Sequence, residues 1–177
     1  MFLETPRLIL RKIQEEDFPD YCAYNLNDPE RDRMMGRDRL DSVEAVRANF
    51  NWLKDKEERA YVLIHKDSGR LIGNLTIYNR GYDPTEHPEV AGKKGFTLSF
   101  GIAGAYQRQG FALEAVRAVI EQLFEQEHAD YIGCGCFSYN IPSQRLQEKL
   151  GFRFLFSECF ELFGEQVEVS EHILWRP

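Results

Sequence analysis

The sequence predicts a single α/β (α+β) domain with a mixed, mostly antiparallel sheet of about seven strands and helices on both faces. Strand-like and helical segments are mixed without strict alternation, which is typical of such a sheet. Several strands follow one another as hairpins, whereas residues 95–137 read as strand, helix and strand, so those two strands should be parallel. The 177 residues, 43% of them hydrophobic, suffice for one well-packed core. Without a repeat or a linker, we expect one domain over residues 1–177.

Apolar residues that alternate or run together mark the strands, and apolar residues three or four positions apart mark the helices. The expected strands span residues 7–12, 60–65, 71–79, 95–102, 131–137, 152–163 and 166–175. The expected helices span residues 15–27, 41–55, 110–126 and 142–150. Between them, the arginine-rich stretch at 31–39 is expected to be an exposed helix or turn, and the long aperiodic loop at 80–94 to be functional or mobile.

Composition argues against several classes of protein. A net charge of −7 disfavours non-specific binding to nucleic acid or to an anionic membrane. The start shows no signal-peptide pattern, and no apolar run approaches the ~18 residues of a membrane span. No CxxC or metal-ligand spacing occurs, so we expect no metal, and buried thiols at Cys134 and Cys136. These features predict a cytoplasmic protein.

The segment AYQRQGFALEAV at 105–116 leads from a strand into a helix through a glycine-containing turn. Such a turn directs several backbone N–H groups and the positive helix end at one point, which suits a phosphate group. Gly110 lets a ligand approach the backbone, and Ala112 keeps the first helical turn slim. Neither G-x-G-x-x-G nor a P-loop is present, so a dinucleotide fold or P-loop is disfavoured. An ordinary helix start is the alternative.

Three motifs resemble those of the GNAT acetyltransferase superfamily. Q-x-x-G-x-A at 107–112 resembles its acyl-CoA pyrophosphate motif, and GFALEA at 110–115 is similar to the G-Y-A-T-E-A common there. NIPSQRLQEKLGF at 140–152 resembles a signature of the RimJ/RimL-like branch, which acetylates ribosomal-protein N-termini. The opening LETPRLILRKIQEEDF at 3–18 is similar to that branch's usual start. The motifs occur in the family's order and spacing.

This resemblance implies an acetyl-CoA-dependent N-acetyltransferase with the acyl-CoA N-acyltransferase fold, in which acetyl-CoA lies where two central parallel strands splay apart. It implies direct attack on the thioester by a primary amine, either a protein N-terminus or a small molecule. It places the pantetheine along the strand backbone from Phe100 to Ile102. The residues that it assigns to the pyrophosphate are Gln107, Arg108, Gln109, Gly110, Phe111 and Ala112. Arg108 is equally well explained as a solvated surface arginine.

The resemblance also assigns catalytic roles. A backbone N–H around Ile102 is the implied donor to the carbonyl oxygen, in line with preorganised dipoles. Many members use a tyrosine in the last helix as the thiolate donor, but Gln147 stands at that position and cannot act as an acid. Ser143 is then the candidate that hydrogen-bonds the sulfur, and Asn140 should hold the cofactor or adjacent backbone. Helix capping is the alternative for both.

No general base is identified from the sequence. Family members often place a glutamate early on the cofactor-binding strand, where this chain has Thr97. Candidates elsewhere are Glu86, His87, Glu89, Glu171 and His172. Each is more commonly a solvated surface residue, and water is an alternative base because the pKa of an α-amine is near 8.

The acceptor pocket is expected from residues 27–40, 80–94 and 160–170, which do not reveal whether the acceptor is acidic or basic. A non-catalytic module that binds or senses acyl-CoA is the alternative from a different class. The final aromatic hairpin is a candidate surface for a homodimer.

Overall fold

The computed structural model describes residues 2–55 and 59–177, which fall into two compact units. The first unit comprises Met1–Thr76 and Phe100–Ala115, and the second comprises Ile77–Ser99 and Val116–Pro177. The strands are β1 (Leu3–Glu4), β2 (Leu8–Lys12), β3 (Arg59–His65), β4 (Leu71–Tyr78), β5 (Gly95–Ile102), β6 (Tyr131–Phe137), β7 (Arg153–Leu162) and β8 (Glu165–Trp175). The helices are α1 (Phe18–Asn25), α2 (Pro29–Met35), α3 (Val43–Asp55), α4 (Phe111–Glu125) and α5 (Ile141–Leu150), with short 3-10 helices η1 (Glu15–Asp17), η2 (Pro88–Val90) and η3 (Gly104–Tyr106).

The strands form a mixed sheet in the order β1-β2-β3-β4-β5-β6-β8-β7. β5 and β6 pair in parallel, whereas β1–β2, β2–β3, β6–β8 and β7–β8 are antiparallel. The predicted mixed, mostly antiparallel sheet is therefore confirmed. The structure adds an eighth strand, β1, which at two residues is too short to produce an alternating pattern in the sequence.

Local signals set the ends of the helices. Ser42 caps α3, since its Oγ accepts the Ala45 N–H at 3.1 Å. Asn140 caps α5, and Gly151 ends it in the left-handed conformation with φ of 89°. The long helix α4 buries an apolar stripe at helical spacing, as predicted. These residues are Ala115, Val116, Val119, Ile120 and Leu123.

Helix α2 corrects the expectation of an exposed helix or turn at 31–39. Arg31 is 9% exposed and Asp32 only 2%. The Asp32 carboxylate pairs with Arg37 at 2.8 Å and accepts the Leu40 N–H at 3.0 Å, while the Arg31 guanidinium lies 3.8 Å from the centre of the Tyr24 ring. Hydropathy does not reveal such burial, because the charges are compensated by partners that only the fold supplies.

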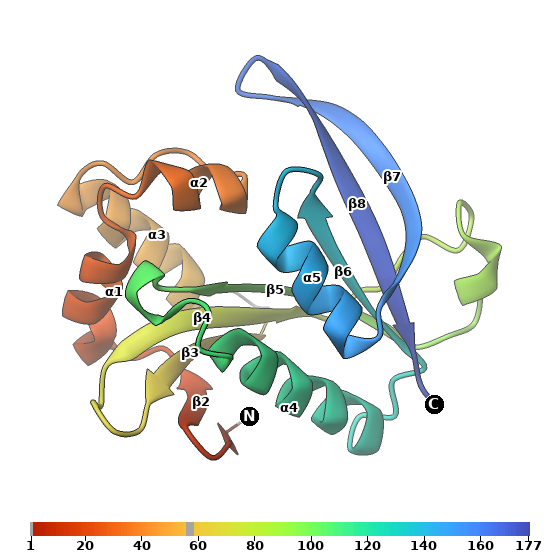
Figure 1. Ribbon diagram of the computed structural model, residues 1–177, viewed down its shortest axis with the longest axis horizontal. Coiled ribbons are helices and arrows are strands. Elements are labelled where there is room, and N and C mark those ends of the chain that lie inside the picture. Colours follow the sequence, from red (N-terminus) through yellow and green to blue (C-terminus); the bar gives the residue numbers. More distant parts are fainter. Residues whose placement is uncertain (1, 56–58) are drawn as a thin grey trace. The chain divides into compact units, whose positions relative to one another are not determined.

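In the second unit, β7 and β8 form a long hairpin around Gly164, and α5 lies against β6 (Figure 1). The parallel register joins residues 95–97 of β5 to residues 131–133 of β6. Within the described part of this unit the register ends there, although β5 runs on through Leu98 and Ser99 and β6 continues to Phe137. The two parallel strands therefore pair at one end only, in agreement with the predicted splay.

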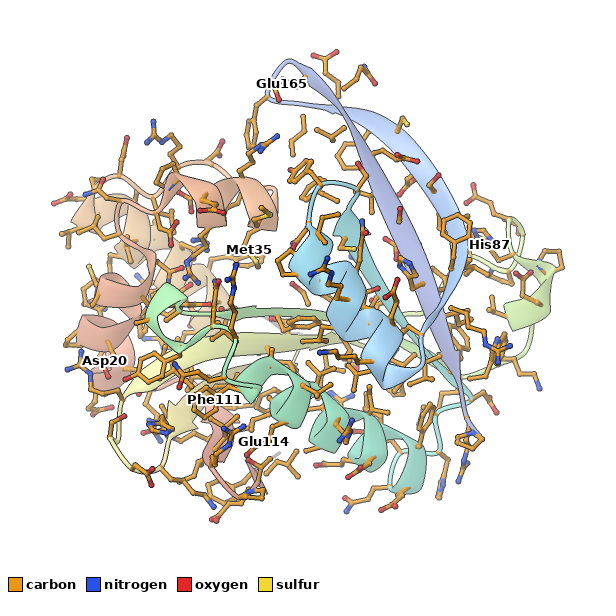
Figure 2. All side chains as sticks on the ribbon, viewed as in Figure 1. Asp20, Met35, His87, Phe111, Glu114 and Glu165 are labelled. Atoms are coloured by element: carbon orange, nitrogen blue, oxygen red, sulfur yellow. The ribbon has the colours of Figure 1, made fainter. Side chains whose placement is uncertain are left out.

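In the first unit, Glu114 ties the beginning of the chain to the first turn of α4. Its carboxylate accepts the Thr5 hydroxyl at 2.6 Å, the Arg7 N–H at 2.9 Å and the Arg7 Nε at 2.6 Å. Figure 2 shows Glu114 and Phe111 extending from this turn. Burial raises the pKa of Glu114, but the hydrogen bonds from Thr5 and Arg7 outweigh it, so the pKa is lowered. The ionised carboxylate therefore stabilises this connection.

We expect Glu114→Gln to lower the free energy of unfolding by about 1 kcal/mol at pH 7, because the ion pair with Arg7 is partly screened by water. The pKa of Glu114 is lower in the folded state than in the unfolded chain, where it is about 4.3. The ionised carboxylate therefore stabilises the fold above the unfolded pKa, and this stabilisation is lost as the pH falls through the folded pKa. The difference from wild type should therefore shrink below about pH 4. Urea unfolding at several pH values measures this, with the exposed Glu121→Gln of the same helix as control. An unchanged difference at low pH would contradict the assigned role of the charge.

Candidate functional site

The loop between β5 and α4 adopts the conformation expected of an anion-binding turn. Arg108 has φ of 60° and Gly110 has φ of 85°, both in the left-handed region. This region is uncommon for a residue such as Arg108, and such strain is often found at functional sites. The Glu114 N–H is bonded to the Gly110 carbonyl at 3.0 Å, so the three preceding amides belong to the first turn, which has no intrahelical acceptors. Those amides and the positive end of α4 suit a diphosphate.

The side chains of this loop hold its shape. Gln107 donates to the Ile102 carbonyl at 3.2 Å, and Gln109 donates to the Ala105 carbonyl at 3.0 Å. Phe111 is buried, and the guanidinium of Arg7 lies 4.3 Å from the centre of its ring. With these side chains engaged by the protein, the backbone is the part of the loop best suited to bind a ligand.

Arg7 brings a positive charge to the same turn. Its Nη1 donates to the Gln109 carbonyl at 3.0 Å, and its Nη2 lies 3.4 Å from where a Cβ on Gly110 would be. The residues that were expected from the sequence to bind the pyrophosphate did not include Arg7. A signal was present, because the T-P-R-L and G-F-A-L-E-A motifs contain the two ends of the Arg7–Glu114 ion pair.

The end of β5 directs the Ile102 amide away from β4. Ala103 donates its N–H to Ile72 of β4 at 2.8 Å, whereas the Ile102 carbonyl accepts from Gln107 and from Arg31, the latter at 3.3 Å. Along an extended strand, consecutive residues direct their N–H and C=O groups to opposite edges. The Ile102 N–H therefore points, like the Ile102 carbonyl, to the outer edge of β5, which is the edge that faces away from β4. Phe100, two residues earlier and half-buried, directs its amide to the same edge.

Asn140 and Ser143 lie in the second unit, at the start of α5. The Asn140 Oδ1 accepts the Ser143 N–H at 3.3 Å, which is the capping role considered from the sequence. The Ser143 Oγ accepts the Gln147 amide at 3.1 Å, and Gln147 is fully buried. Because Gln147 occupies an acceptor position of this hydroxyl, the hydroxyl proton is directed elsewhere.

From the sequence, Gln147 was notable only because it replaces the tyrosine that is usual at this position. In the structure it is the residue that orients Ser143 from one helical turn away, a spacing at which side chains meet. Ser143 and Gln147 also hydrogen-bond the Cys136 thiol; burial raises the pKa of Cys136 and these bonds partly offset the rise. Cys134 and Cys136 are buried, as predicted.

The candidate bases differ in their surroundings. Glu86 and Glu89 are exposed, and His87 stacks on Phe156 with ring centres 4.2 Å apart (His87 is labelled in Figure 2). Glu171 is half-buried on β8, and burial raises its pKa although a hydrogen bond from Tyr82 opposes the rise. For His172, next to it, burial lowers the pKa. A raised carboxyl pKa brings a group closer to the pH at which it can exchange protons.

One expected acceptor segment lies beside the end of β5 within the first unit. A Cβ on Gly101 would lie 3.8 Å from the Met35 sulfur and 2.8 Å from the Tyr24 hydroxyl, which itself donates to Asn74 at 3.0 Å. Met35, labelled in Figure 2, ends α2. The polar stretch around α2 therefore does supply side chains to this strand.

Two classes of feature are not found among residues 2–55 and 59–177. No group of three or more His, Cys, Asp or Glu side chains is arranged to hold a metal ion. No helix in these ranges is both long and apolar enough to cross a membrane.

Comparison with known proteins gives one consistent result. The family model described as "Acetyltransferase (GNAT) domain" matches residues 7–153. The N-acetyltransferase YnaD of Bacillus subtilis (strain 168) is 24% identical over 153 residues, covering 86% of this chain and 83% of that protein.

Two solved structures share the fold. The GNAT-family acetyltransferase of Bacillus anthracis superimposes with a TM-score of 0.82 at 21% identity, covering 99% of this chain and 98% of its own. The spermidine N-acetyltransferase of Vibrio cholerae, in complex with CoA and spermine, superimposes with a TM-score of 0.75 at 19% identity, covering 97% and 96%. The chain belongs to the GNAT family of N-acetyltransferases, and its motifs are those of the RimJ/RimL-like branch.

Proposed function

We propose that this chain transfers an acetyl group from acetyl-CoA to a primary amine by direct attack. Enzymes of its family use acetyl-CoA. The observation that carries the proposal is the turn before α4, where Arg108 and Gly110 are left-handed and the first helical amides lack intrahelical acceptors. Acetyl-CoA supplies a thioester whose carbonyl carbon accepts the amine. We also propose that residues 1–177 act as one catalytic domain, because the matched range 7–153 draws on both units.

In this proposal the backbone does most of the cofactor binding. The pyrophosphate takes the amides of residues 107–112, and Arg7 adds a positive charge beside Gly110. Phe100 and Ile102 present their backbone groups at the outer edge of β5 to the pantetheine. The absence of a side chain at Gly110 suits this reading, because a Cβ there would stand 3.4 Å from Arg7 Nη2, the charge assigned to the pyrophosphate.

Three residues serve the reaction itself. The Ile102 N–H, directed away from β4, donates to the carbonyl oxygen as charge develops on it. The Ser143 hydroxyl hydrogen-bonds the departing sulfur without losing its proton, a direction favoured by the hydrogen bond that it accepts from Gln147. Asn140 acts through Ser143, because it fixes the Ser143 backbone at the start of α5.

The acceptor class is a primary amine, either a protein N-terminal α-amine or a small-molecule amine. The RimJ/RimL-like motifs favour the first, and the polyamine named for the Vibrio cholerae spermidine N-acetyltransferase favours the second. The net charge of −7 suits a cationic acceptor of either kind.

The first test is a calorimetric titration with acetyl-CoA, CoA and ATP, comparing wild type with Gly110→Glu. We expect wild type to bind both CoA compounds, and the variant to lose at least about tenfold in affinity, because it places bulk and negative charge where the pyrophosphate lies. Gly164→Glu is the matched control, since Gly164 also has a left-handed φ, of 79°, and lies in the β7–β8 turn. Equal affinity of wild type and Gly110→Glu would refute the site.

The second test concerns Ser143. We expect Ser143→Ala to lower kcat by about 10- to 100-fold, the value of one hydrogen bond to a developing charge, with little change in CoA affinity. Release of the CoA thiol over time measures kcat, and calorimetry measures affinity. Ser157→Ala, on the exposed part of β7, is the control. A rise in KM with unchanged kcat would assign Ser143 to binding instead.

A further inference from the structure

The half-buried carboxylate of Glu171, in the second unit, forms no ion pair with a cation among the residues that the structure describes. Glu171 accepts the Tyr82 hydroxyl at 2.9 Å, and the charge that acts on it is another anion, Glu158. By contrast, Asp32 and Glu114 each pair with an arginine. A desolvated carboxylate without a cation is costly, so it is a natural place for a proton or a cationic ligand to bind.

Two glycines of β6 make room for this carboxylate. Glu171 lies opposite Gly135 in the β6–β8 register, and a Cβ on Gly135 would come within 2.1 Å of its Oε1. A Cβ on Gly133 would lie 2.6 Å from the Tyr82 hydroxyl oxygen. Glu171 and Tyr82 therefore lie against bare strand backbone. Gly135 itself is exposed, so the carboxylate borders a solvent-accessible surface.

The two faces of β6 carry different chemistry. Thr97 shares the glycine face, since its Cγ2 lies 2.9 Å from where a Cβ on Gly133 would be. Successive strand residues face opposite sides, so Cys136 points to the other face, where it contacts Ser143. Glu171 and Ser143 thus lie on opposite sides of one strand. An acyl transfer uses both functions, a proton acceptor for the nucleophile and a hydrogen-bond donor to the leaving group.

Tyr82 satisfies Glu171 in either protonation state. The Tyr82 hydroxyl lies 2.9 Å from a Glu171 oxygen and 2.8 Å from the His172 carbonyl oxygen, but it has one proton to donate. It donates to Glu171 when that carboxylate is ionised. When Glu171 is protonated, the acid donates to Tyr82, whose proton turns to the His172 carbonyl. The Tyr82 backbone is held by a bond from its N–H to the Tyr131 hydroxyl at 2.8 Å.

We propose that Glu171 is the catalytic base that takes a proton from the acceptor ammonium, with Tyr82 as its positioning residue. The proposal deepens the acetyl transfer proposed above and rests on it. One proton passes from R–NH3+ to the Glu171 carboxylate, and the freed nitrogen lone pair forms the C–N bond. The C–S bond breaks with its electron pair left on sulfur. The second nitrogen proton neutralises the thiolate, and Glu171 returns its own proton to water.

The surroundings of Glu171 set the direction of the pH dependence. The titratable groups around it are Tyr82, Cys134, Cys136, Glu158 and the adjacent His172, and His87 lies against the Tyr82 ring. Burial raises the pKa of Tyr82 and of Cys134, so both remain protonated and neutral at working pH. The pKa of Glu171 is raised, first by burial. The rate should therefore rise with pH as Glu171 ionises, above the usual glutamate range.

The test measures thiol release from acetyl-CoA as a function of pH, with spermidine and an alanyl peptide as acceptors. We expect Glu171→Gln to lower kcat/KM by about 10²-fold or more and to retain CoA affinity. The variant should also lose the lower limb of the pH profile, which is the rise in rate that accompanies ionisation of Glu171. Glu168→Gln, a carboxylate on the exposed side of β8, is the matched control. We expect Tyr82→Phe to shift that limb to higher pH, because the Tyr82 hydrogen bond lowers the Glu171 pKa.

A second readout does not depend on turnover. Carbon-13 NMR of labelled glutamate side chains, compared between wild type and Glu171→Gln, identifies the Glu171 carboxyl, which should titrate above about 4.3. Titration at or below that value would overturn the proposal. Full activity with an intact lower limb in Glu171→Gln would overturn this base alone, whereas no thiol release by wild type with either amine would overturn acetyl transfer as well. If Glu171→Gln loses CoA affinity, its rate no longer tests the base. The NMR titration of Glu171 and the pH profile of Tyr82→Phe then test whether Glu171 is the base.

Discussion

The arrangement of the loop between β5 and α4, the proposed cofactor loop, depends on one ion pair, between Arg7 and Glu114. Arg7 comes from the start of the chain and reaches the Glu114 carboxylate, the Gln109 carbonyl and the Phe111 ring. These contacts hold the turn in place. The left-handed backbone at Arg108 stores strain, and such strain persists only where surrounding contacts hold it. The ion pair therefore links a structural segment to the proposed pyrophosphate site.

The strand β6 organises the second unit in a comparable way. Its sequence YIGCGCF alternates glycines with cysteines, so the middle of one face, at Gly133 and Gly135, is bare and the other face carries buried thiols. The bare face accommodates Tyr82 and Glu171, and the thiol face meets α5 at Ser143. A strand with side chains on both faces would displace the Glu171 carboxylate. The glycines are thus best explained by the close approach of other side chains, not by a turn.

Buried polar side chains support the proposed reactive groups in both units. Gln147 orients the Ser143 hydroxyl, Arg31 binds the Ile102 carbonyl, and Tyr82 holds Glu171. Each of these supporting residues is buried or half-buried and hydrogen-bonded, which restricts its rotamers. This arrangement is what a site requires if its reacting groups are to be positioned before the substrate binds.

The sequence by itself determined most of the elements, the parallel pair and the position of the proposed cofactor turn. It did so because periodicity, caps such as Asn140 and the glycine at 110 act through local backbone geometry. It also identified the family through three motifs. The tertiary structure alone decided that Arg31 and Asp32 are buried, that Gln147 serves Ser143, and that Glu171 stands apart from the other candidate bases. These properties depend on partners far away in the chain, and a carboxylate's pKa depends on the burial and hydrogen bonds that only folding creates.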